Sequence, residues 1–259
     1  MKTYILGPCA MDSAALYSEV AEELCRIIPP WPSVDFYYKA SFDKANRTSI
    51  RGKRGIGLEE AIKVFKEMKK KRPGLKLTTD IHTPEQAIKL AGVVDLAQIP
   101  AFLCRQTDLI VECARNFDKV NIKKMQHLGP ANLIKSIDKI KNTNPSCEAW
   151  LTERGTAFGY DHLIVDFTIV DELKKYYDKV ILDCTHATQR SRKVHIVQGD
   201  PELAKRYFLT AKIMGYDGVF AETHPRPNES ASDGDSMILL SEMAGLIERA
   251  EKIDWVGSK

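Results

Sequence analysis

The sequence predicts a single (β/α)₈ barrel, and three observations lead to this fold class. The chain has 259 residues, of which 44% are hydrophobic and 28% charged, a composition typical of globular proteins. Barrels of this kind commonly reach about 250 residues as one domain. Short apolar runs alternate with segments of helical periodicity, and polar side chains follow nearly every run. Because no linker interrupts the pattern, we expect one catalytic domain over residues 1–259.

Eight apolar runs, rich in Val, Ile, Leu or aromatic residues, are the expected strands. They cover residues 3–6, 34–39, 75–79, 94–99, 119–122, 148–151, 179–182 and 218–221. Eight such units favour a closed barrel over an open doubly wound sheet. No Gly-x-Gly-x-x-Gly motif follows a strand, which also argues against a nicotinamide-dependent oxidoreductase.

Between the strands, apolar residues recur every three or four positions, which is the spacing of a helix with one buried face. The clearest stripes are formed by Leu16, Val20, Leu24 and Ile28, by Leu58, Ile62 and Phe65, by Leu133, Ile137 and Ile140, and by Leu240, Met243, Leu246 and Ile247. Pro84 and Pro201 fall in expected first turns, where proline is tolerated. Core packing accounts for these stripes without any functional role.

Charge and cysteine usage exclude several classes of partner. The 38 Lys and Arg residues against 35 Asp and Glu leave a net charge of +3, too small and too well mixed to indicate a nucleic-acid or membrane surface. No apolar run approaches the roughly 18 residues that span a bilayer. The six cysteines are scattered without a Cys-x-x-Cys pair, and the first residues do not form a secretion signal. We therefore expect a reduced, cytoplasmic protein without disulfides.

Six cations follow expected strands and would share the C-terminal mouth of the barrel. They are Lys39, Lys44, Arg47, Lys123, Lys124 and Arg154. Their mutual repulsion is costly unless an anion neutralises it, and phosphate is the commonest anion of this kind in protein sites. The alternative is that each is a solvated or paired surface charge. The number of cations at one rim favours a multiply charged substrate.

A second set of side chains at the mouth could bind a metal ion. Cys9, His186 and Glu222 follow the first, seventh and eighth strands, and Asp233 lies in the loop after the eighth. One thiolate, one imidazole and two carboxylates suit Zn²⁺, Fe²⁺ or Mn²⁺. Their spacing alone is no metal signature, and a buried cysteine with a hydrogen-bonded histidine explains it better.

Several segments closely resemble the 3-deoxy-D-manno-octulosonate 8-phosphate synthases, in order and over nearly the whole chain. They are GPCAMDS (7–13), YKASFDKANRTSIRG (38–52), TTDIHTPEQA (78–87), QIPAFLCRQTDL (98–109), NIKK (121–124), LTERGTAFGY (151–160), DCTH (183–186), ETHPRP (222–227) and SDG (232–234). KANRTS is the most telling, because the related heptulosonate-phosphate synthases typically carry KPRTS there.

The resemblance implies an enzyme that condenses phosphoenolpyruvate with arabinose 5-phosphate and water, and releases phosphate. By motif, the phosphoenolpyruvate site would comprise Lys39, Ser41, Lys44, Lys123 and Arg154, with Gln98 and Ala101 lining it and Gln189 beside it. The aldose phosphate would be held by Asn46, Arg47 and Thr48. Lys123 and Asn46 are candidate catalytic residues, and Asp80 and His186 are candidates for handling the proton of water.

The resemblance also implies a cofactor and an assembly. Members with Cys in the first motif depend on a metal, whereas metal-independent members carry Asn there. Cys9, His186, Glu222 and Asp233 match the ligands of the metal-dependent type, so a divalent ion is expected, either Zn, Fe or Mn. The family forms homotetramers in which the arginine matching Arg105 reaches the aldose phosphate of an adjacent subunit.

Two stretches depart from the family pattern and put the acceptor sugar in question. After His186 the chain has a basic segment with Arg190, Arg192, Lys193 and His195, which we expect to be a loop over the mouth. Met125 and His127 stand where the family has smaller or apolar residues. Two alternatives therefore stay open. One is a related synthase that uses a different aldose or aldose phosphate, and the other is a barrel that binds a phosphorylated metabolite without catalysis.

Overall fold

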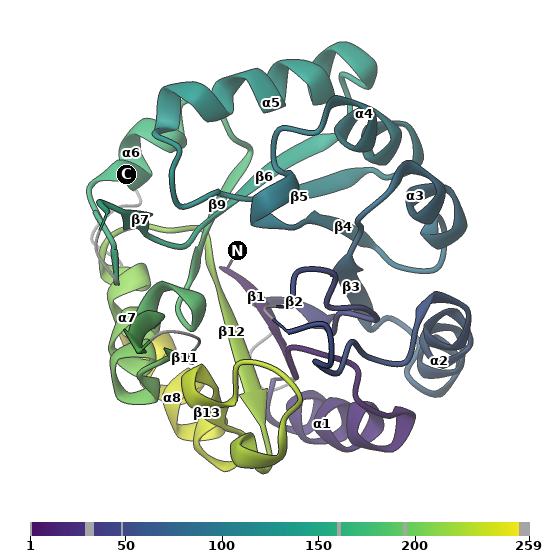
Figure 1. The fold of residues 1–259 in the computed structure, drawn as a ribbon, viewed down its shortest axis with the longest axis vertical. Helices are drawn as coiled ribbons and strands as arrows, with labels where there is room; N and C mark the ends of the chain where they lie inside the picture. Colours follow the sequence, from purple (N-terminus) through teal and green to yellow (C-terminus); the bar gives the residue numbers. More distant parts are fainter. Residues whose placement is uncertain (1, 29–33, 48, 160–161, 194–195, 254–259) are drawn as a thin grey trace.

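Eight parallel strands close into a barrel, as predicted (Figure 1). The computed structural model describes residues 2–28, 34–47, 49–159, 162–193 and 196–253. The barrel strands are β1 (Lys2–Gly7), β2 (Val34–Lys39), β3 (Lys76–Asp80), β4 (Leu96–Ile99), β5 (Lys119–Lys123), β6 (Glu148–Glu153), β9 (Lys179–Asp183) and β12 (Gly218–His224). Each overlaps an expected run. β12 ends three residues later than expected, and β4 starts two residues later, where the side chain of Asp95 accepts a hydrogen bond from the Leu77 amide at 2.7 Å.

Helices surround the barrel and place their apolar stripes against it (Figure 1). They are α1 (Ala14–Ile27), α2 (Leu58–Lys71), α3 (Pro84–Leu90), α4 (Thr107–Asn116), α5 (Pro130–Thr143), α6 (Ile169–Leu173), α7 (Pro201–Ile213) and α8 (Met243–Lys252). The side chains of Ser13, Thr83 and Asp200 cap α1, α3 and α7 by accepting a hydrogen bond from an amide of the first turn. No helix within the described ranges is long and apolar enough to cross a bilayer.

The barrel closes where β1 pairs in parallel with β12, and this register brings Gly7 opposite Glu222. A side chain at position 7 is excluded, because a Cβ there would lie 1.9 Å from the carbonyl oxygen of Lys39. Glycine thus lets the end of β1 lie directly against the end of β2. The close approach brings Cys9, which follows β1, to the same rim as Lys39 and Glu222.

The barrel interior has an apolar layer with a polar layer above it. The apolar layer consists of Ile5, Tyr37, Leu96, Trp150, Ile181 and Phe220. Side chains two positions further along a strand point to the same side and lie one step nearer the mouth. On five of these strands that step places a buried polar residue, namely Lys39, Gln98, Thr152, Asp183 and Glu222. The floor of the mouth is therefore polar and rests on a packed apolar base.

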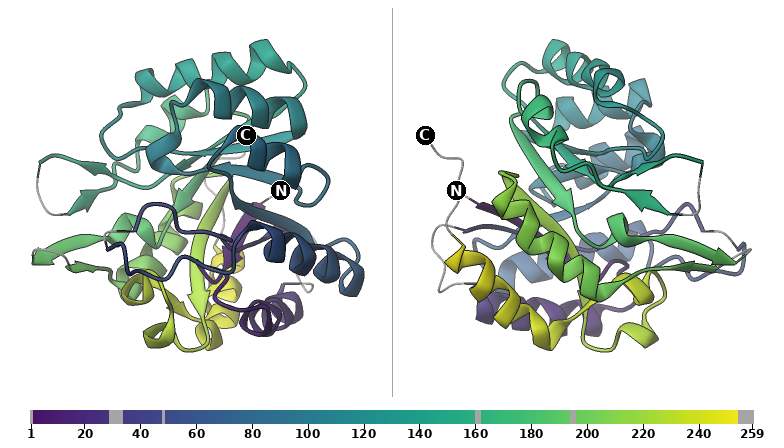
Figure 2. Two further views of the ribbon diagram at one scale, coloured as in Figure 1. Left: turned by 45° about the vertical axis from the view of Figure 1, so that its right-hand side comes forward. Right: turned by 90° about the vertical axis from the view of Figure 1, so that its left-hand side faces the viewer.

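Two antiparallel hairpins extend from the mouth (Figure 2). They are β7 (Thr156–Ala157) with β8 (Leu163–Ile164), and β10 (Arg190–Lys193) with β11 (Ile196–Gln198). The basic segment that we expected to be a loop thus forms a hairpin, with Arg190 paired to Gln198, because cross-strand pairing satisfies its backbone polar groups. His195 lies outside the described residues, as do the side chains of Arg192 and Lys193. The remaining short elements are β13 (Ile238–Leu239) and the 3₁₀ turns Ala101–Leu103, His186–Thr188, Pro227–Glu229, Gly234–Ser236 and Leu240–Glu242.

Candidate active site

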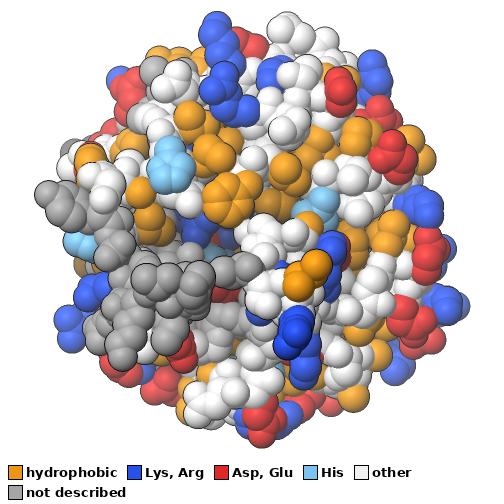
Figure 3. Space-filling model, viewed as in Figure 1, with side chains coloured by type: hydrophobic (Ala, Val, Ile, Leu, Met, Phe, Trp, Pro, Cys, Tyr) orange, Lys and Arg blue, Asp and Glu red, His pale blue; other side chains and the backbone are white. Residues whose placement is uncertain are grey.

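A cavity of about 850 Å³ opens at the C-terminal mouth of the barrel. Figure 3 looks onto this face and shows Lys or Arg atoms within its central hollow. Twelve of the predicted site residues line the cavity, namely Lys39, Lys44, Asn46, Arg47, Asp80, Gln98, Ala101, Lys123, Arg154, His186, Gln189 and Asp233. The convergence of strand ends thus gathers the predicted cations and acids in one place.

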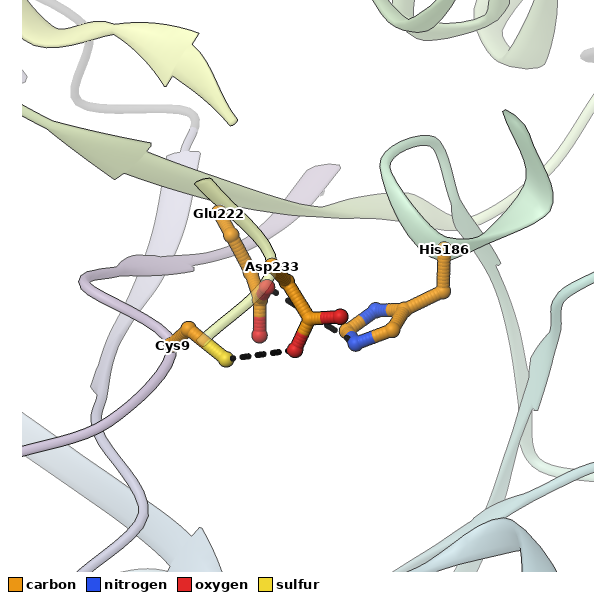
Figure 4. Close-up of side chains that lie close together, drawn as sticks. All are labelled: Cys9, His186, Glu222 and Asp233. Carbon is orange, nitrogen blue, oxygen red and sulfur yellow. Dashed lines mark hydrogen bonds and ion pairs between the residues drawn. The ribbon is translucent and has the colours of Figure 1, made fainter. Parts of the chain in front are cut away.

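The four candidate metal ligands converge on a common point (Figure 4). One ligand atom from each of Cys9, His186, Glu222 and Asp233 lies within 4.8 Å of the others. Sγ of Cys9 donates a hydrogen bond to Oδ2 of Asp233 at 3.2 Å, and Nε2 of His186 lies 3.7 Å from Oε2 of Glu222. Burial, reinforced by the Glu222 carboxylate, raises the pKa of the Cys9 thiol well above its usual range.

The cluster has the chemistry of a divalent-metal site. Oε2 of Glu222 is buried without a hydrogen-bond partner, which is costly unless a ligand satisfies it. Two carboxylates, a thiol and an imidazole at this spacing form a suitable donor set for Zn²⁺, Fe²⁺ or Mn²⁺. Asp233 also has a left-handed backbone with φ 55°, the sole such non-glycine residue in the described part of the chain. Strain of this kind concentrates at functional sites.

Lys123 lies on the floor of the cavity between an acid and an aromatic ring. Its amino group pairs with Oδ2 of Asp183 and lies 3.3 Å from the centre of the Phe220 ring. Burial lowers the pKa of Lys123, and the charge of Asp183 offsets this only in part. Asp183 also lies 2.8 Å from Nδ1 of His186, so it orients the imidazole and fixes which nitrogen faces the metal cluster.

A second group of cations surrounds Asp80. Nζ of Lys39 lies 3.5 Å from both Oδ2 of Asp80 and Oε1 of Glu222, and 3.1 Å from the Cys9 carbonyl oxygen. Although burial opposes ionisation, the charges of Lys39 and Lys44 hold the pKa of Asp80 below its usual range. Ser41 is fully buried behind Asp80, donates to it, and does not line the cavity.

Gln189 connects Arg154 to the metal cluster. Its Oε1 accepts a hydrogen bond from Nη2 of Arg154 at 2.8 Å, and its Nε2 donates to Oδ1 of Asp233 at 2.9 Å. Nε of Arg154 is buried without a partner and belongs to a side chain that lines the cavity. An unpaired guanidinium nitrogen at a cavity wall is suited to bind an anionic oxygen.

The other predicted residues lie further from the cluster. Arg47 donates to Oγ of Ser232 and to the carbonyl oxygen of Ala231, both at 2.7 Å, so it holds the loop that carries Asp233. Asn46 is exposed at the rim. Arg105 is exposed outside the cavity, and Thr48 lies outside the described residues. Lys124 is fully buried and donates to Gly155 and Thr156, which directs it away from the cavity.

Sequence reasoning did not assign roles to Asp183, Phe220 or Ser232. Asp183 ends the seventh barrel strand, a position that could have marked it as the partner of a cation across the mouth. The sequence gives no sign of a functional role for Phe220, because its ring belongs to the apolar layer. The ring meets Lys123 only once the barrel has closed. Ser232 is found only through its hydrogen bonds to Arg47 and Asp233.

The profile of the DAHP synthetase I family matches residues 2–256. The chain belongs to this family. It is 42% identical to the 2-dehydro-3-deoxyphosphooctonate aldolase of Wolinella succinogenes, over 95% of this chain and 96% of that protein. It is 41% identical to the protein of the same name from Helicobacter hepaticus, over 96% and 95%, and 40% identical to that of Bartonella quintana, over 98% and 91%.

These matches confirm the resemblance to the octulosonate-phosphate synthases and the predicted class of enzyme, a synthase that forms carbon–carbon bonds. The family membership covers the cation-lined cavity and the Cys-His-Glu-Asp cluster together, since both lie within residues 2–256. A barrel that only binds a metabolite does not account for either group being so fully assembled.

Proposed function

We propose that the chain condenses phosphoenolpyruvate with arabinose 5-phosphate and water to give 3-deoxy-D-manno-octulosonate 8-phosphate and inorganic phosphate. One observation carries the proposal: a single cavity joins a floor of buried cations to a compact metal-binding cluster. The reaction brings together two anionic substrates, and the aldehyde group of the aldose phosphate must be activated. The relatives' printed name, which describes a phosphorylated 2-dehydro-3-deoxy sugar acid, supports the same chemistry.

The cations would hold the anionic groups of phosphoenolpyruvate. Lys123 and Arg154 lie on the cavity wall, and the unpaired Nε of Arg154 can receive a carboxylate or phosphate oxygen. Lys39 and Lys44 extend the positive wall toward the metal cluster. Carbon 3 of phosphoenolpyruvate attacks the aldehyde, water adds at carbon 2, and phosphate leaves by cleavage of its bond to that carbon. Fixed cations stabilise the negative charge throughout these steps.

Cys9, His186, Glu222 and Asp233 would hold the divalent ion beside the cavity, which His186 and Asp233 line. When bound, such an ion supplies Lewis-acid polarisation of the aldehyde oxygen. Asp183 holds Nδ1 of His186 and so presents Nε2 to the cluster. Arg47 and Asn46, which line the cavity at its rim, would hold the phosphate of the acceptor.

A second candidate is the same reaction with a different aldose or aldose phosphate. The hairpin of β10 and β11 favours it, because it directly follows the turn that carries His186 and places the basic segment at the mouth. Arg190, the first residue of the hairpin, is exposed. A more anionic acceptor would complement this charge.

The test is phosphate release from phosphoenolpyruvate against a panel of four-carbon and five-carbon aldoses and their phosphates, with Mn²⁺ or with EDTA. Products are identified by mass. Release with arabinose 5-phosphate that EDTA abolishes supports the first candidate and its metal dependence. Phosphate release only with another acceptor supports the second candidate. Binding of phosphoenolpyruvate without phosphate release in the presence of any acceptor contradicts both.

A further inference from the structure

Side chains on four neighbouring strands form a continuous hydrogen-bond chain beneath the cavity. Oγ1 of Thr152 donates to Oδ1 of Asn121 at 2.9 Å, and Nδ2 of Asn121 donates to Oε1 of Gln98 at 3.0 Å. Nε2 of Gln98 then donates to Oδ1 of Asp80 at 2.6 Å. The chain runs from β6 through β5 and β4 to β3, and it ends on Asp80.

Every bond in this chain points the same way, and ionised Asp80 dictates the direction. A carboxylate can only accept, so the Gln98 amide must present its NH₂ group to it. The carbonyl of Gln98 is then left for the amide of Asn121, whose own carbonyl accepts from Thr152. All four side chains are buried, and water does not compete for the groups of Asn121 and Thr152, which are completely enclosed.

The other oxygen of Asp80 is engaged as well. Oδ2 accepts from the hydroxyl of Ser41 and lies 3.5 Å from Nζ of Lys39. Nζ of Lys39 is in turn 3.5 Å from Glu222 at the metal cluster. Both oxygens of Asp80 are therefore engaged, and one of them is a charge partner for Lys39.

We propose that this chain keeps Asp80 ionised and thereby fixes Lys39 at the floor of the cavity. Thr152 and Asn121, which do not line the cavity, are positioning residues that act on the substrate only through Asp80. Asp80 is then a fixed anion and not the group that takes the proton of water. The inference rests on the proposed function, since Lys39 is one of the cations assigned to phosphoenolpyruvate.

The test is a double-mutant cycle between Thr152 and Asp80, which are linked only through two intervening side chains. Thr152→Val and Asp80→Asn are made singly and together, and unfolding by urea is measured at pH 7. Thr78→Val is the matched control, because Thr78 is equally buried on the strand of Asp80 but donates to the Leu96 carbonyl at 2.8 Å. Thr152→Ser keeps the donor and serves as the conservative variant.

Thr152→Val should raise the unfolding equilibrium constant roughly fivefold in the wild-type background, about the worth of one buried hydrogen bond. The effect should fall to about twofold or less with Asp80→Asn, because a neutral amide no longer polarises the hydrogen bonds of the chain as the carboxylate does. Thr78→Val should have the same effect in both backgrounds, and so should Thr152→Ser, which keeps the donor and loses only a buried methyl group. An equal effect of Thr152→Val in both backgrounds would falsify the proposal. If the Thr152→Val protein does not fold, Thr152→Ala takes its place in the cycle.

Calorimetric binding of phosphoenolpyruvate tests the link to Lys39 without requiring turnover. Thr152→Val should weaken binding roughly twofold, about half the free energy of one hydrogen bond, whereas Thr78→Val should leave it unchanged. Equal binding by the two variants would show that the chain stabilises the barrel but does not position Lys39. A wild-type protein that binds phosphoenolpyruvate but releases no phosphate with any acceptor contradicts the proposed function and leaves the cycle interpretable.

Discussion

The side-chain amide of Gln189 donates a hydrogen bond to Oδ1 of Asp233 at 2.9 Å. Partners that orient a metal ligand typically contribute a factor of about 10 to 100 in metal affinity. Gln189→Leu should therefore weaken binding of Mn²⁺ roughly tenfold, as measured by calorimetry on metal-free protein. Gln106→Leu, at an exposed glutamine outside the cavity, is the control. Unchanged affinity in Gln189→Leu would show that this hydrogen bond does not orient a ligand.

Lys123 and Asp183 form a buried ion pair, so removing one partner leaves an uncompensated charge. Lys123→Met should lower the free energy of unfolding by about 3 kcal/mol. The double variant with Asp183→Asn should recover most of the lost free energy of unfolding. It should not recover the release of phosphate from phosphoenolpyruvate. Lys63→Met, in an exposed ion pair with Glu60, should cost less than about 1 kcal/mol. Equal losses in the single and double variants would contradict the assigned pairing.

Metal affinity should depend on pH through Cys9. Because burial raises the pKa of this thiol, it is protonated near neutral pH and must lose its proton to bind a metal. Affinity should therefore rise with pH, about tenfold per unit between about pH 6 and pH 8. Calorimetry in buffers of different ionisation enthalpy counts the released protons. Cys9→Asn should release one proton fewer, and an unchanged proton count would rule out the thiol as a ligand.

Arg105 is exposed away from the cavity of its own chain, so its proposed role requires an adjacent subunit. Arg105→Ala should raise the KM for the aldose phosphate and leave the KM for phosphoenolpyruvate unchanged. The Arg105→Ala variant and the inactive Lys123→Met variant can be mixed by joint unfolding and refolding. The mixture should regain activity, because some sites of mixed assemblies have both residues intact. Absence of restoration in assemblies shown to be mixed would contradict the action of Arg105 in a neighbouring site.

The basic hairpin should affect the acceptor alone. Replacing Arg190, Arg192 and Lys193 with Ala should raise the KM for the aldose severalfold without changing the KM for phosphoenolpyruvate. The physical reason is the loss of positive charge at the side of the mouth where the segment after His186 lies. Steady-state kinetics at two salt concentrations checks this, because the difference should shrink as salt rises. Equal KM values for the aldose would show that the hairpin does not contact it.

The barrel could be predicted because its signals are local. Each strand is a short apolar run, and each polar side chain that follows one must reach the same mouth once the strands are parallel. Cys9, Lys123 and Asp233 were predicted in this way or by family resemblance, and the structure brings them to one cavity or its wall. The same reasoning placed Lys124 at the mouth, but its side chain is directed to Gly155 instead.

Contacts across the barrel were beyond prediction, because they depend on register between strands distant in sequence. Ser41 and Asp80 are separated by 39 positions, and their hydrogen bond hides the serine from the cavity. The first strand of the hairpin, Arg190–Lys193, contains no apolar residue, and its pairing rests on backbone groups. Sequence patterns therefore locate the mouth. The partners of each charged group can be identified only when the register of the strands in the folded barrel is known.

The parallel pairing of β1 with β12 has a consequence for biosynthesis. Cys9 leaves the ribosome well before Glu222 and Asp233, which follow it in the chain by 213 and 224 residues. A nascent chain lacks half of the cluster until the final strand closes the ring. An ion held by all four residues would therefore bind after closure and would not be the nucleus around which the earlier strands assemble.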